Sequence, residues 1–308
     1  MDWEIVLKAA ETKKIINALI AYLRKSNPLK KKSRPFDYQT TRLSMLTFSQ
    51  LRSAFQELKL TDQPVIVHSS LKRFGPIDGG AETVIQALLD STNGLMVPTF
   101  TYLTMITPEV GPANNGITYG RDRDLNKMAV SFHKDLQPDK MMGSLPFALL
   151  HHESASRTVH PILSFGGIDV DYALYTQTLY EPLAPIGALA EQDGWVILIN
   201  VDHSVNTSIH YAEKLAGRRQ FIRWAMVEDR IVECPGFPGD SSGFIAIEEY
   251  VKDYTRFAQI NNAVIQAISI KKLFAAVQEL IKKNPLALLC QRSDCDRCNA
   301  VRDVNQGL

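Results

Sequence analysis

The sequence lacks the features that would place it in a membrane or on a nucleic acid. No apolar run reaches the roughly 18 to 20 residues that cross a bilayer, and the first residues, MDWEIVLKAAETKK, do not have the order of a signal peptide. Neither sign of charge is in excess, because 34 Lys and Arg residues stand against 33 Asp and Glu residues. We therefore expect a cytoplasmic protein that acts on small molecules, with no nucleic acid and no membrane as partner.

Motifs for nucleotide binding are also absent. The chain has no Gly-Lys-Ser/Thr of a phosphate-binding loop, no G-x-G-x-x-G fingerprint, no internal repeat and no low-complexity segment. With 45% hydrophobic and 22% charged residues, its 308 residues can bury a large core. We expect a globular protein whose chemistry depends on local clusters of polar residues.

Cysteines are few and unevenly spread. Cys290, Cys295 and Cys298 crowd the C-terminal segment CQRSDCDRC, whereas Cys234 stands alone. Disulfides are rare in cytosolic chains, and a C-x-x-C pair with a third thiol five residues upstream suits tetrahedral zinc, with Cys234 as the fourth ligand. Four protein ligands would leave no open position on the metal, so the site would be structural. The alternative is a set of reduced surface thiols on a polar tail.

Hydrophobic periodicity divides the chain into two parts. Apolar residues repeat every three or four positions over residues 3–25, which predicts an amphipathic helix. The basic stretch of residues 27–42 is typical of a solvated linker. We assign residues 1–45 to this helix and linker, and residues 46–308 to a single domain with a Cys-rich tail.

Within the domain, short apolar strands alternate with amphipathic helices. Helices are expected over residues 47–58, 79–90, 144–152, 207–217 and 271–284, strands over residues 64–70, 94–101, 161–165, 194–201 and 260–270, and a hairpin over residues 221–233. This alternation predicts an α/β fold, a three-layer α/β/α sandwich around a largely central sheet. The hairpin predicts that the sheet is mixed.

A first polar segment follows the predicted strand of residues 64–70. It leaves the strand at His68 and reaches Gly79 and Gly80 at a helix start. Free backbone N–H groups at such a start can bind an anion or a carbonyl oxygen. The alternative is an ordinary connection between a strand and a helix.

A second polar segment is NTSIHYAE, residues 206–213. If Thr207 caps the helix, His210 is the third helical residue, where the helix dipole disfavours the imidazolium and keeps the ring neutral. A neutral imidazole can act as a base, and Glu213 lies on the same helix face. The alternative is a His–Glu pair exposed to solvent.

Two further histidines are candidates for the same edge of the sheet. The proline after His160 in RTVHP favours extended backbone at a strand entry. His203 follows the strand of residues 194–201, and sites in α/β sheets gather beyond strand C-termini. The alternative for each is a structural side chain with satisfied hydrogen bonds.

Together these segments resemble the aminoglycoside 3-N-acetyltransferases, the antibiotic N-acetyltransferase family. The similarity runs from about Thr47 to Cys298 and is carried by VHSSL, GGAETVIQAL, GLMVPTFT, RTVHP, QDGWVILINVDHSVNTSIHYAE and the Cys-rich tail. It implies an acetyl-CoA-dependent N-acetyltransferase with a fold distinct from that of the GNAT acetyltransferases. The acceptor would be a primary amine of an aminoglycoside, at the 3-amino group of the 2-deoxystreptamine ring.

The resemblance also implies roles for individual residues. His210 would be the base, with Glu213 as a nearby carboxylate, and His160 joins the catalytic candidates. Asp240 in GFPGDSSG would orient the ring or bind the substrate ammonium. Thr207, or a backbone N–H near Ser70, would donate to the thioester oxygen. The CoA arm would contact His68, Ser69, Ser70, Leu71, Gly79, Gly80 and Thr83.

Departures from the family pattern affect the expected substrate. The family's GVGHDSN loop reads NVDHSVN here, so two glycines are replaced by Asn200 and Asp202, and Ala184 loses a hydroxyl. A net charge of +1 gives no acidic excess for a polycationic substrate, although Asp202, Glu213 and Asp240 could supply local acids. Another amino sugar or a natural-product amine is therefore an alternative substrate.

Two other classes of function stay open at the level of sequence. Ser69, Ser70 and His210 could belong to an acyl-CoA hydrolase, but neither serine stands in a G-x-S-x-G elbow. A zinc-stapled binding module without catalysis is the third class. The oligomeric state is open as well, with a homodimer as one alternative.

Overall fold

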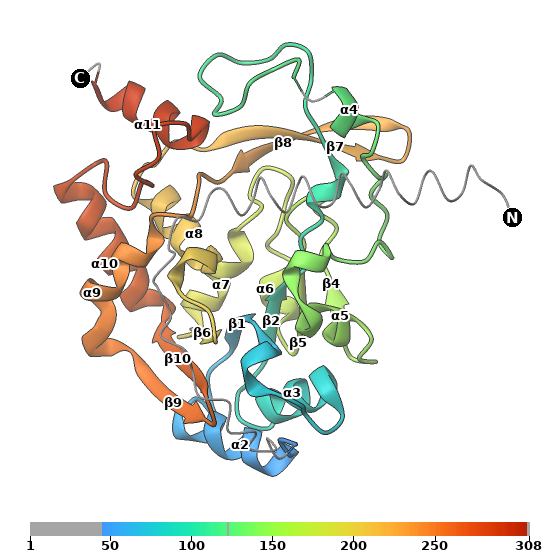
Figure 1. Cartoon of the computed structure of the whole chain (residues 1–308), viewed down its shortest axis with the longest axis vertical. Helices are drawn as coiled ribbons and strands as arrows, with labels where there is room; N and C mark the ends of the chain where they lie inside the picture. Colours follow the sequence, from blue (N-terminus) through green and yellow to red (C-terminus); the bar gives the residue numbers. More distant parts are fainter. Residues whose placement is uncertain (1–44, 122, 307–308) are drawn as a thin grey trace, which may run out of the picture. The chain divides into compact units, whose positions relative to one another are not determined.

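The computed structural model describes residues 45–121 and 123–306. The helix predicted over residues 3–25 and the linker after it lie outside the described residues. The described chain forms a seven-stranded mixed sheet with helices on both faces, and a separate three-stranded sheet (Figure 1). Among the described helices, none combines the length and the apolar content needed to cross a membrane.

The central sheet has three parallel strands at its middle and antiparallel strands at both sides. Its spatial order is β4 (Ser156–Arg157), β5 (Phe165–Ile168), β2 (Leu95–Pro98), β1 (Val65–Ser69), β6 (Trp195–Ile199), β10 (Ala263–Ser269) and β9 (Arg256–Ile260). β1 is parallel to β2 and β6, and the other pairs are antiparallel. The parallel strands are continuous apolar runs because helices cover both of their faces.

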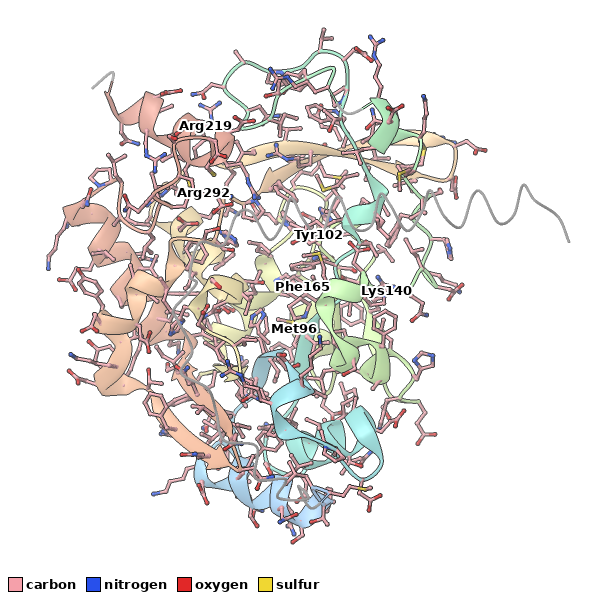
Figure 2. All side chains as sticks on the ribbon, viewed as in Figure 1. Met96, Tyr102, Lys140, Phe165, Arg219 and Arg292 are labelled. Carbon is pink, nitrogen blue, oxygen red and sulfur yellow. The ribbon has the colours of Figure 1, made fainter. Side chains whose placement is uncertain are left out.

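Two layers of helices cover this sheet. One face carries α2 (Phe48–Glu57), α3 (Gly80–Leu89) and α5 (Ser144–Leu150), and the other carries α6 (Asp171–Leu174), α7 (Ala184–Glu191), α8 (Thr207–Leu215) and α10 (Ile270–Lys283). Neighbouring strand residues alternate between the two cores. Met96 of β2 and Phe165 of β5, both fully buried, belong to the core beneath the second set of helices (Figure 2). The predicted three-layer α/β/α sandwich is confirmed.

The predicted hairpin is confirmed, but it belongs to a second sheet. β7 (Phe221–Val227) pairs with β8 (Arg230–Phe237) and with β3 (Met105–Ile106), apart from the central sheet. Buried and half-buried residues alternate along most of β7, as expected for a strand with one covered face. The central sheet is mixed for another reason, because β10, β9, β5 and β4 are antiparallel to their neighbours.

Most predicted helices lie where expected, and the first begins with the predicted capping box, in which Thr47 and Gln50 bond each other's backbone. The sequence prediction missed α7 and also α11 (Asp296–Gln306), which includes Cys298 of the cysteine-rich tail. The remaining elements are short: η1 (Leu71–Phe74), η2 (Tyr102–Thr104), α4 (Arg123–Asn126), η3 (Lys140–Met142), η4 (His203–Val205), η5 (Phe244–Ile247), α9 (Glu248–Val251) and η6 (Lys252–Tyr254), where η denotes a 3₁₀ helix.

Candidate active site

The candidate site lies at the edge of the sheet where the parallel strands end. The connections after β1 and β6 are fixed to each other, because the Ser70 N–H donates to the Ile199 carbonyl at 2.9 Å and the Asn200 amide donates to the Ser70 carbonyl at 3.2 Å. Asn200 adopts a left-handed φ of 57°. Asparagine tolerates this conformation better than most residues, so the chain keeps the turn where the family pattern has glycine.

α8 starts one residue earlier than the sequence predicts. Its N-cap is Asn206, whose side chain accepts a hydrogen bond from the Ser208 N–H at 3.1 Å. Thr207 is therefore the first helical residue and His210 the fourth, which corrects the predicted cap. His210 still lies in the first turn or just past it, near the positive end of the helix dipole.

His210 and Glu213 form a buried pair on α8. The Nδ1 atom of His210 lies 3.1 Å from Oε2 of Glu213, and the two side chains are 10% and 3% exposed. A carboxylate at Nδ1 fixes the ring tautomer with its proton on Nδ1, which leaves Nε2 as the acceptor. The ring also packs edge-on against Phe244, with centroids 4.6 Å apart. The alternative of a solvent-exposed pair is wrong.

The second oxygen of Glu213 faces an arginine that the sequence analysis did not single out. Oε1 lies 3.7 Å from Nε of Arg218, and this guanidinium is also 3% exposed. Burial lowers the pKa of Arg218, and the charge of Glu213 opposes that shift. The sequence holds one indication of this contact, the glycine at position 217 that ends the helix. In the structure Gly217 adopts φ of 80° and turns the chain back.

Three other histidines near this edge are buried and neutral. Burial, helped by His203, lowers the pKa of His68 to about 3, and burial lowers the pKa values of His160 and His203 to about 4. The Nε2 atom of each has no hydrogen-bond partner within the described ranges. Nδ1 of His160 accepts from the N–H groups of Ile162 and Leu163. His160 therefore holds a turn before β5, and the structure gives it no contact with His210.

Acid is expected to destabilise the protein through these histidines. Their folded-state pKa values lie below the ordinary 6.5, so the unfolded chain binds protons that the folded chain excludes. The contribution of these histidines to the free energy of unfolding is complete above pH 6.5. It falls by about 1.4 kcal/mol per pH unit for each histidine as the pH decreases toward 4. Urea unfolding at a series of pH values measures this slope. His68→Asn should flatten it and the exposed control His151→Asn should not; equal slopes in both variants would contradict the assignment.

The predicted CoA-binding residues occupy one continuous segment. Ser69, Ser70 and Leu71 are partly exposed after β1, whereas the ring of His68 is buried. Because the Ser70 N–H is already donated to Ile199, it is not free to bind a thioester oxygen. The donor predicted near Ser70 would then be a neighbouring backbone N–H, and it stays a prediction beside Thr207.

The start of α3 is open and shaped by its glycines. Gly79 and Gly80 are exposed and have φ values of 72° and 66°, and a Cβ atom on Gly80 would meet no atom within 4 Å. A Cβ atom on Gly79 would instead lie 2.3 Å from the Thr83 hydroxyl, which donates to the Asp78 carbonyl at 2.5 Å. Thr83 therefore supports the turn, while the space beside Gly80 can receive a ligand.

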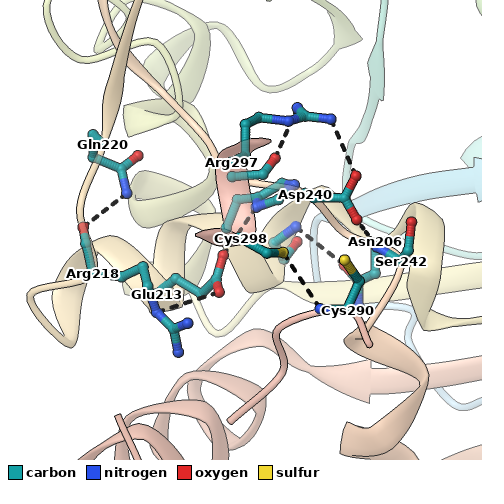
Figure 3. Close-up of polar contacts among 12 residues, drawn as sticks. Asn206, Glu213, Arg218, Gln220, Asp240, Ser242, Cys290, Arg297 and Cys298 are labelled. Atoms are coloured by element: carbon teal, nitrogen blue, oxygen red, sulfur yellow. Dashed lines mark hydrogen bonds and ion pairs between the residues drawn. The ribbon is translucent and has the colours of Figure 1, made fainter. Parts of the chain in front are cut away.

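Asp240 joins the C-terminal cysteines instead of His210. Its carboxylate and the sulfur atoms of Cys290, Cys295 and Cys298 lie within 4.8 Å of one another, and all four residues are buried. The carboxylate also accepts hydrogen bonds from Arg292 and Arg297, the latter drawn in Figure 3. The prediction that Asp240 orients His210 is wrong, because the residue of this loop that contacts the ring is Phe244.

The protonation of this group reflects its crowding. Burial disfavours ionisation of Asp240, but the hydrogen bond from Ser242 and the charge of Arg297 outweigh it and hold the pKa below its usual value. A hydrogen bond with Cys298 lowers the pKa of Cys295 to about 5 and raises that of Cys298. Asp240 and Cys295 therefore favour the anionic form, whereas Cys298 favours the protonated thiol.

Cys234 does not belong to this group. It lies in β8 with 1% exposure, among apolar side chains, and its thiol contacts the Val232 carbonyl at 3.7 Å. Burial raises its pKa to about 12. The prediction of Cys234 as fourth ligand is wrong, because the ligand atom that meets the three tail sulfurs belongs to Asp240.

One motif escaped the sequence analysis. Residues 239–243 read GDSSG and match G-x-S-x-G around Ser241. The segment follows an antiparallel strand, β8, and precedes the four-residue 3₁₀ helix η5, so it is not the strand–turn–α-helix elbow of the α/β hydrolases. It does not support a serine nucleophile.

Comparison with known proteins gives one family. A family model described as aminoglycoside 3-N-acetyltransferase matches residues 66–282. An aminoglycoside N(3)-acetyltransferase IX from Micromonospora chalcea is 28% identical over 186 residues, which cover 56% of this chain. The chain spans 64% of the length of that relative.

Two solved structures have the same fold. A mutant of aminoglycoside acetyltransferase AAC(3)-IVa in complex with gentamicin matches with a TM-score of 0.65 and 19% identity, over 84% of this chain and 97% of that one. AAC-IIIb with CoASH matches with a TM-score of 0.63 and 18% identity, over 78% and 97%. At these identities the similarity shows the fold, and the expected non-GNAT architecture is confirmed.

Proposed function

We propose, because the chain belongs to the aminoglycoside 3-N-acetyltransferase family, that it transfers the acetyl group of acetyl-CoA to a primary amine of an aminoglycoside, at the 3-amino group of the 2-deoxystreptamine ring. The buried His210–Glu213 pair, 3.1 Å apart at the carboxyl edge of the sheet, carries this proposal. The names of the relative and of the two solved structures, which include an aminoglycoside N(3)-acetyltransferase and proteins holding gentamicin and CoASH, support it. Acetyl-CoA is a cytoplasmic metabolite, so the proposal places the protein there.

In this reaction His210 acts as the general base. Nε2 accepts the proton of the attacking amine as the new C–N bond forms, while Glu213 holds the Nδ1 proton and stabilises the charge on the ring. The C–S bond then breaks, and the proton held on Nε2 of His210 passes to the sulfur, so that CoA leaves as the thiol and the ring is neutral again. Thr207, at the start of α8 and 7% exposed, is the proposed donor to the developing oxyanion.

The segment from Ser69 to Gly80 is the proposed site for the CoA arm. Its partly exposed residues after β1 are hydrogen-bonded to the connection that leads from β6 toward α8, and the open start of α3 offers N–H groups to a phosphate. Gly80 matters most there, because a side chain would need the left-handed backbone and would enter the ligand's space.

A smaller amine is a second candidate substrate, and a specific observation favours it. Of the three acids that could attract a polycation, Glu213 is paired with His210 and Arg218, and Asp240 with two arginines. Of the three, Asp202 alone is exposed, and its carboxylate accepts a hydrogen bond from the Ser204 N–H. An amino sugar or natural-product amine with fewer charges needs fewer acids.

A thiol-release assay with acetyl-CoA tests the reaction class. We expect release that depends on an added aminoglycoside and saturates with it; release only with small amines would select the second candidate. Release of thiol and acetate without any amine would indicate a hydrolase, and CoA binding without release would indicate a binding module. Either of these last outcomes would contradict the proposed transfer.

The proposal includes a structural zinc ion on Cys290, Cys295, Cys298 and Asp240. Zinc–sulfur bonds of about 2.3 Å in a tetrahedron separate the ligand atoms by about 3.8 Å, which the observed limit of 4.8 Å accommodates. Three thiolates and one carboxylate around Zn²⁺ carry a net charge of −2, which Arg292 and Arg297 offset at the Asp240 carboxylate. The zinc would tie the tail and the start of α11 to the loop after β8.

Metal analysis of protein purified without chelator tests this part. We expect roughly one zinc ion per chain, and loss of it in Cys298→Ser together with a lower Tm. Cys234→Ala is the matched control, because that cysteine lies outside the group, and it should retain the metal. Metal-free protein, with its cysteines either free or oxidised to a disulfide, would contradict the site.

A further inference from the structure

Arg218 is a buried cation that shares one carboxylate with the candidate base. Its guanidinium lies 3.7 Å from Oε1 of Glu213, while Oε2 of the same carboxylate lies 3.1 Å from Nδ1 of His210. The side chains of Arg218 and Glu213 are each 3% exposed, so water screens their interaction little. Any change in the position or charge of Arg218 therefore acts on the Glu213 carboxylate, whose other oxygen contacts His210.

The position of Arg218 is set by the backbone and by the C-terminal tail. Gly217 turns the chain after α8, and the Arg218 N–H donates to the Glu213 carbonyl at 2.9 Å. Its Nη2 donates to the Ala287 carbonyl at 2.8 Å. Figure 3 shows Arg218 and Glu213 beside the segment that carries Cys290 and Cys298. The guanidinium thus joins Glu213 to the tail.

The same tail segment also packs on the loop that carries Phe244, the aromatic neighbour of His210. A Cβ atom on Gly243 would lie 2.4 Å from the Leu288 carbonyl oxygen, so the tail backbone packs directly on this glycine. The next residue, Phe244, packs on the ring of His210. Residues 287–289 therefore contact both Arg218 and Gly243, the residue that precedes the aromatic neighbour of the ring.

We infer that Arg218 is a positioning residue for the His210–Glu213 pair and connects this pair to the C-terminal tail. It places a positive charge 3.7 Å from one carboxylate oxygen while the other oxygen faces Nδ1, and this ion pair, which involves no hydrogen bond from Nε, balances the carboxylate in the dry interior. Without Arg218, the His210–Glu213 pair would retain an added proton more tightly, because no positive charge would oppose the Glu213 carboxylate beside the ring. The inference deepens the proposed transfer and rests on it only for the role of His210 as base.

Two variants and a matched control test the inference. Arg218→Met removes the charge at similar length, Arg218→Lys restores a charge without the guanidinium fork, and Arg219→Met alters the neighbouring arginine, whose nearest acceptor is the Ala113 carbonyl at 3.5 Å. The first readout is the pH titration of the His210 ring by NMR, which needs no turnover. The second is kcat for acetyl transfer per CoA-binding site, with its pH dependence. Among the described residues, the ion pairs of the ring and its carboxylate involve Glu213 and Arg218, and Cys298 also acts on the charge of Arg218.

For Arg218→Met we expect the ring to take up its proton at higher pH and the acidic limb of the rate profile to move the same way. We expect kcat to fall about 10- to 100-fold, the range that loss of an orienting partner costs at histidine metal sites, with little change in either KM. Arg218→Lys should recover part of both effects, and Arg219→Met should show neither.

The outcomes separate this inference from the proposed function. A shifted ring titration in a protein that transfers no acetyl group would keep the role of Arg218 and reject the transferase. An unmoved ring titration in folded Arg218→Met would overturn the inference, whatever the activity. If that variant does not fold, Arg218→Lys decides: an unchanged titration and rate would overturn the inference, and an intermediate shift would support it.

Discussion

Replacing His210 by alanine is expected to lower kcat for acetyl transfer about 100- to 10,000-fold, because the variant has no group to accept the amine proton. CoA binding should persist, since the proposed CoA segment lies on β1, η1 and α3 and not on α8. Steady-state kinetics measures the first effect and calorimetric titration with CoA the second.

The control for this variant is the exposed His151→Ala, which should keep the wild-type kcat. An alanine at position 210 also leaves a small gap beside Phe244, so unfolding must be measured to show that the active fraction is unchanged. A rate within a few-fold of wild type in folded His210→Ala would contradict the assignment of the base.

Changing Glu213 to glutamine is expected to reduce both stability and rate. Glutamine keeps the shape but leaves the guanidinium of Arg218 buried without its counter-ion, which costs roughly 3–5 kcal/mol in the free energy of unfolding. A glutamine amide can also donate to Nδ1 and select the wrong tautomer, so we expect kcat to fall at least about 100-fold. Urea unfolding and steady-state kinetics measure the two effects.

The double variant Glu213→Gln/Arg218→Met separates the two causes. Removing both members of the pair should recover much of the lost stability, because no buried charge remains, but not the rate. Glu279→Gln, at a surface glutamate paired with Lys283, is the control and should change neither quantity measurably. Wild-type stability in Glu213→Gln would show that the buried ion pair is not formed.

Local patterns explain what the sequence could predict. His210 and Glu213 are three residues apart on one helix, so their contact depends only on helical spacing and on burial of that face. The three layers of the α/β/α fold could be predicted in the same way, from the alternation of apolar strands and amphipathic helices along the chain. The apolar runs around Ile66 and Ile197 read as strands covered on both faces, and both residues are fully buried.

Features that depend on tertiary contacts could not be predicted. The fourth member of the cysteine group is Asp240 because the loop after β8 meets the tail, and Cys234, within β8, is not part of the group. The pairing of β7 with β3 joins segments more than 100 residues apart. Arg218 was missed because a charged residue after a helix is usually solvated, and only the turn at Gly217 marks its return.

The buried acids change the view of the substrate. From sequence, Glu213 and Asp240 counted as acids available to a cationic amine, but each already has a cationic partner inside the protein. Recognition of an aminoglycoside would then depend on the exposed Asp202 and on hydroxyl and carbonyl groups around the site. This makes the identity of the acetylated product the most informative property of the protein.

The most direct test of the account is to identify that product. The protein, acetyl-CoA and a 2-deoxystreptamine aminoglycoside are incubated, and the product is examined by mass spectrometry and NMR. The account predicts an aminoglycoside carrying a single acetyl group, located on the 3-amino nitrogen, and none with His210→Ala. An unmodified aminoglycoside together with free acetate, or an acetylated product formed equally by His210→Ala, would contradict it.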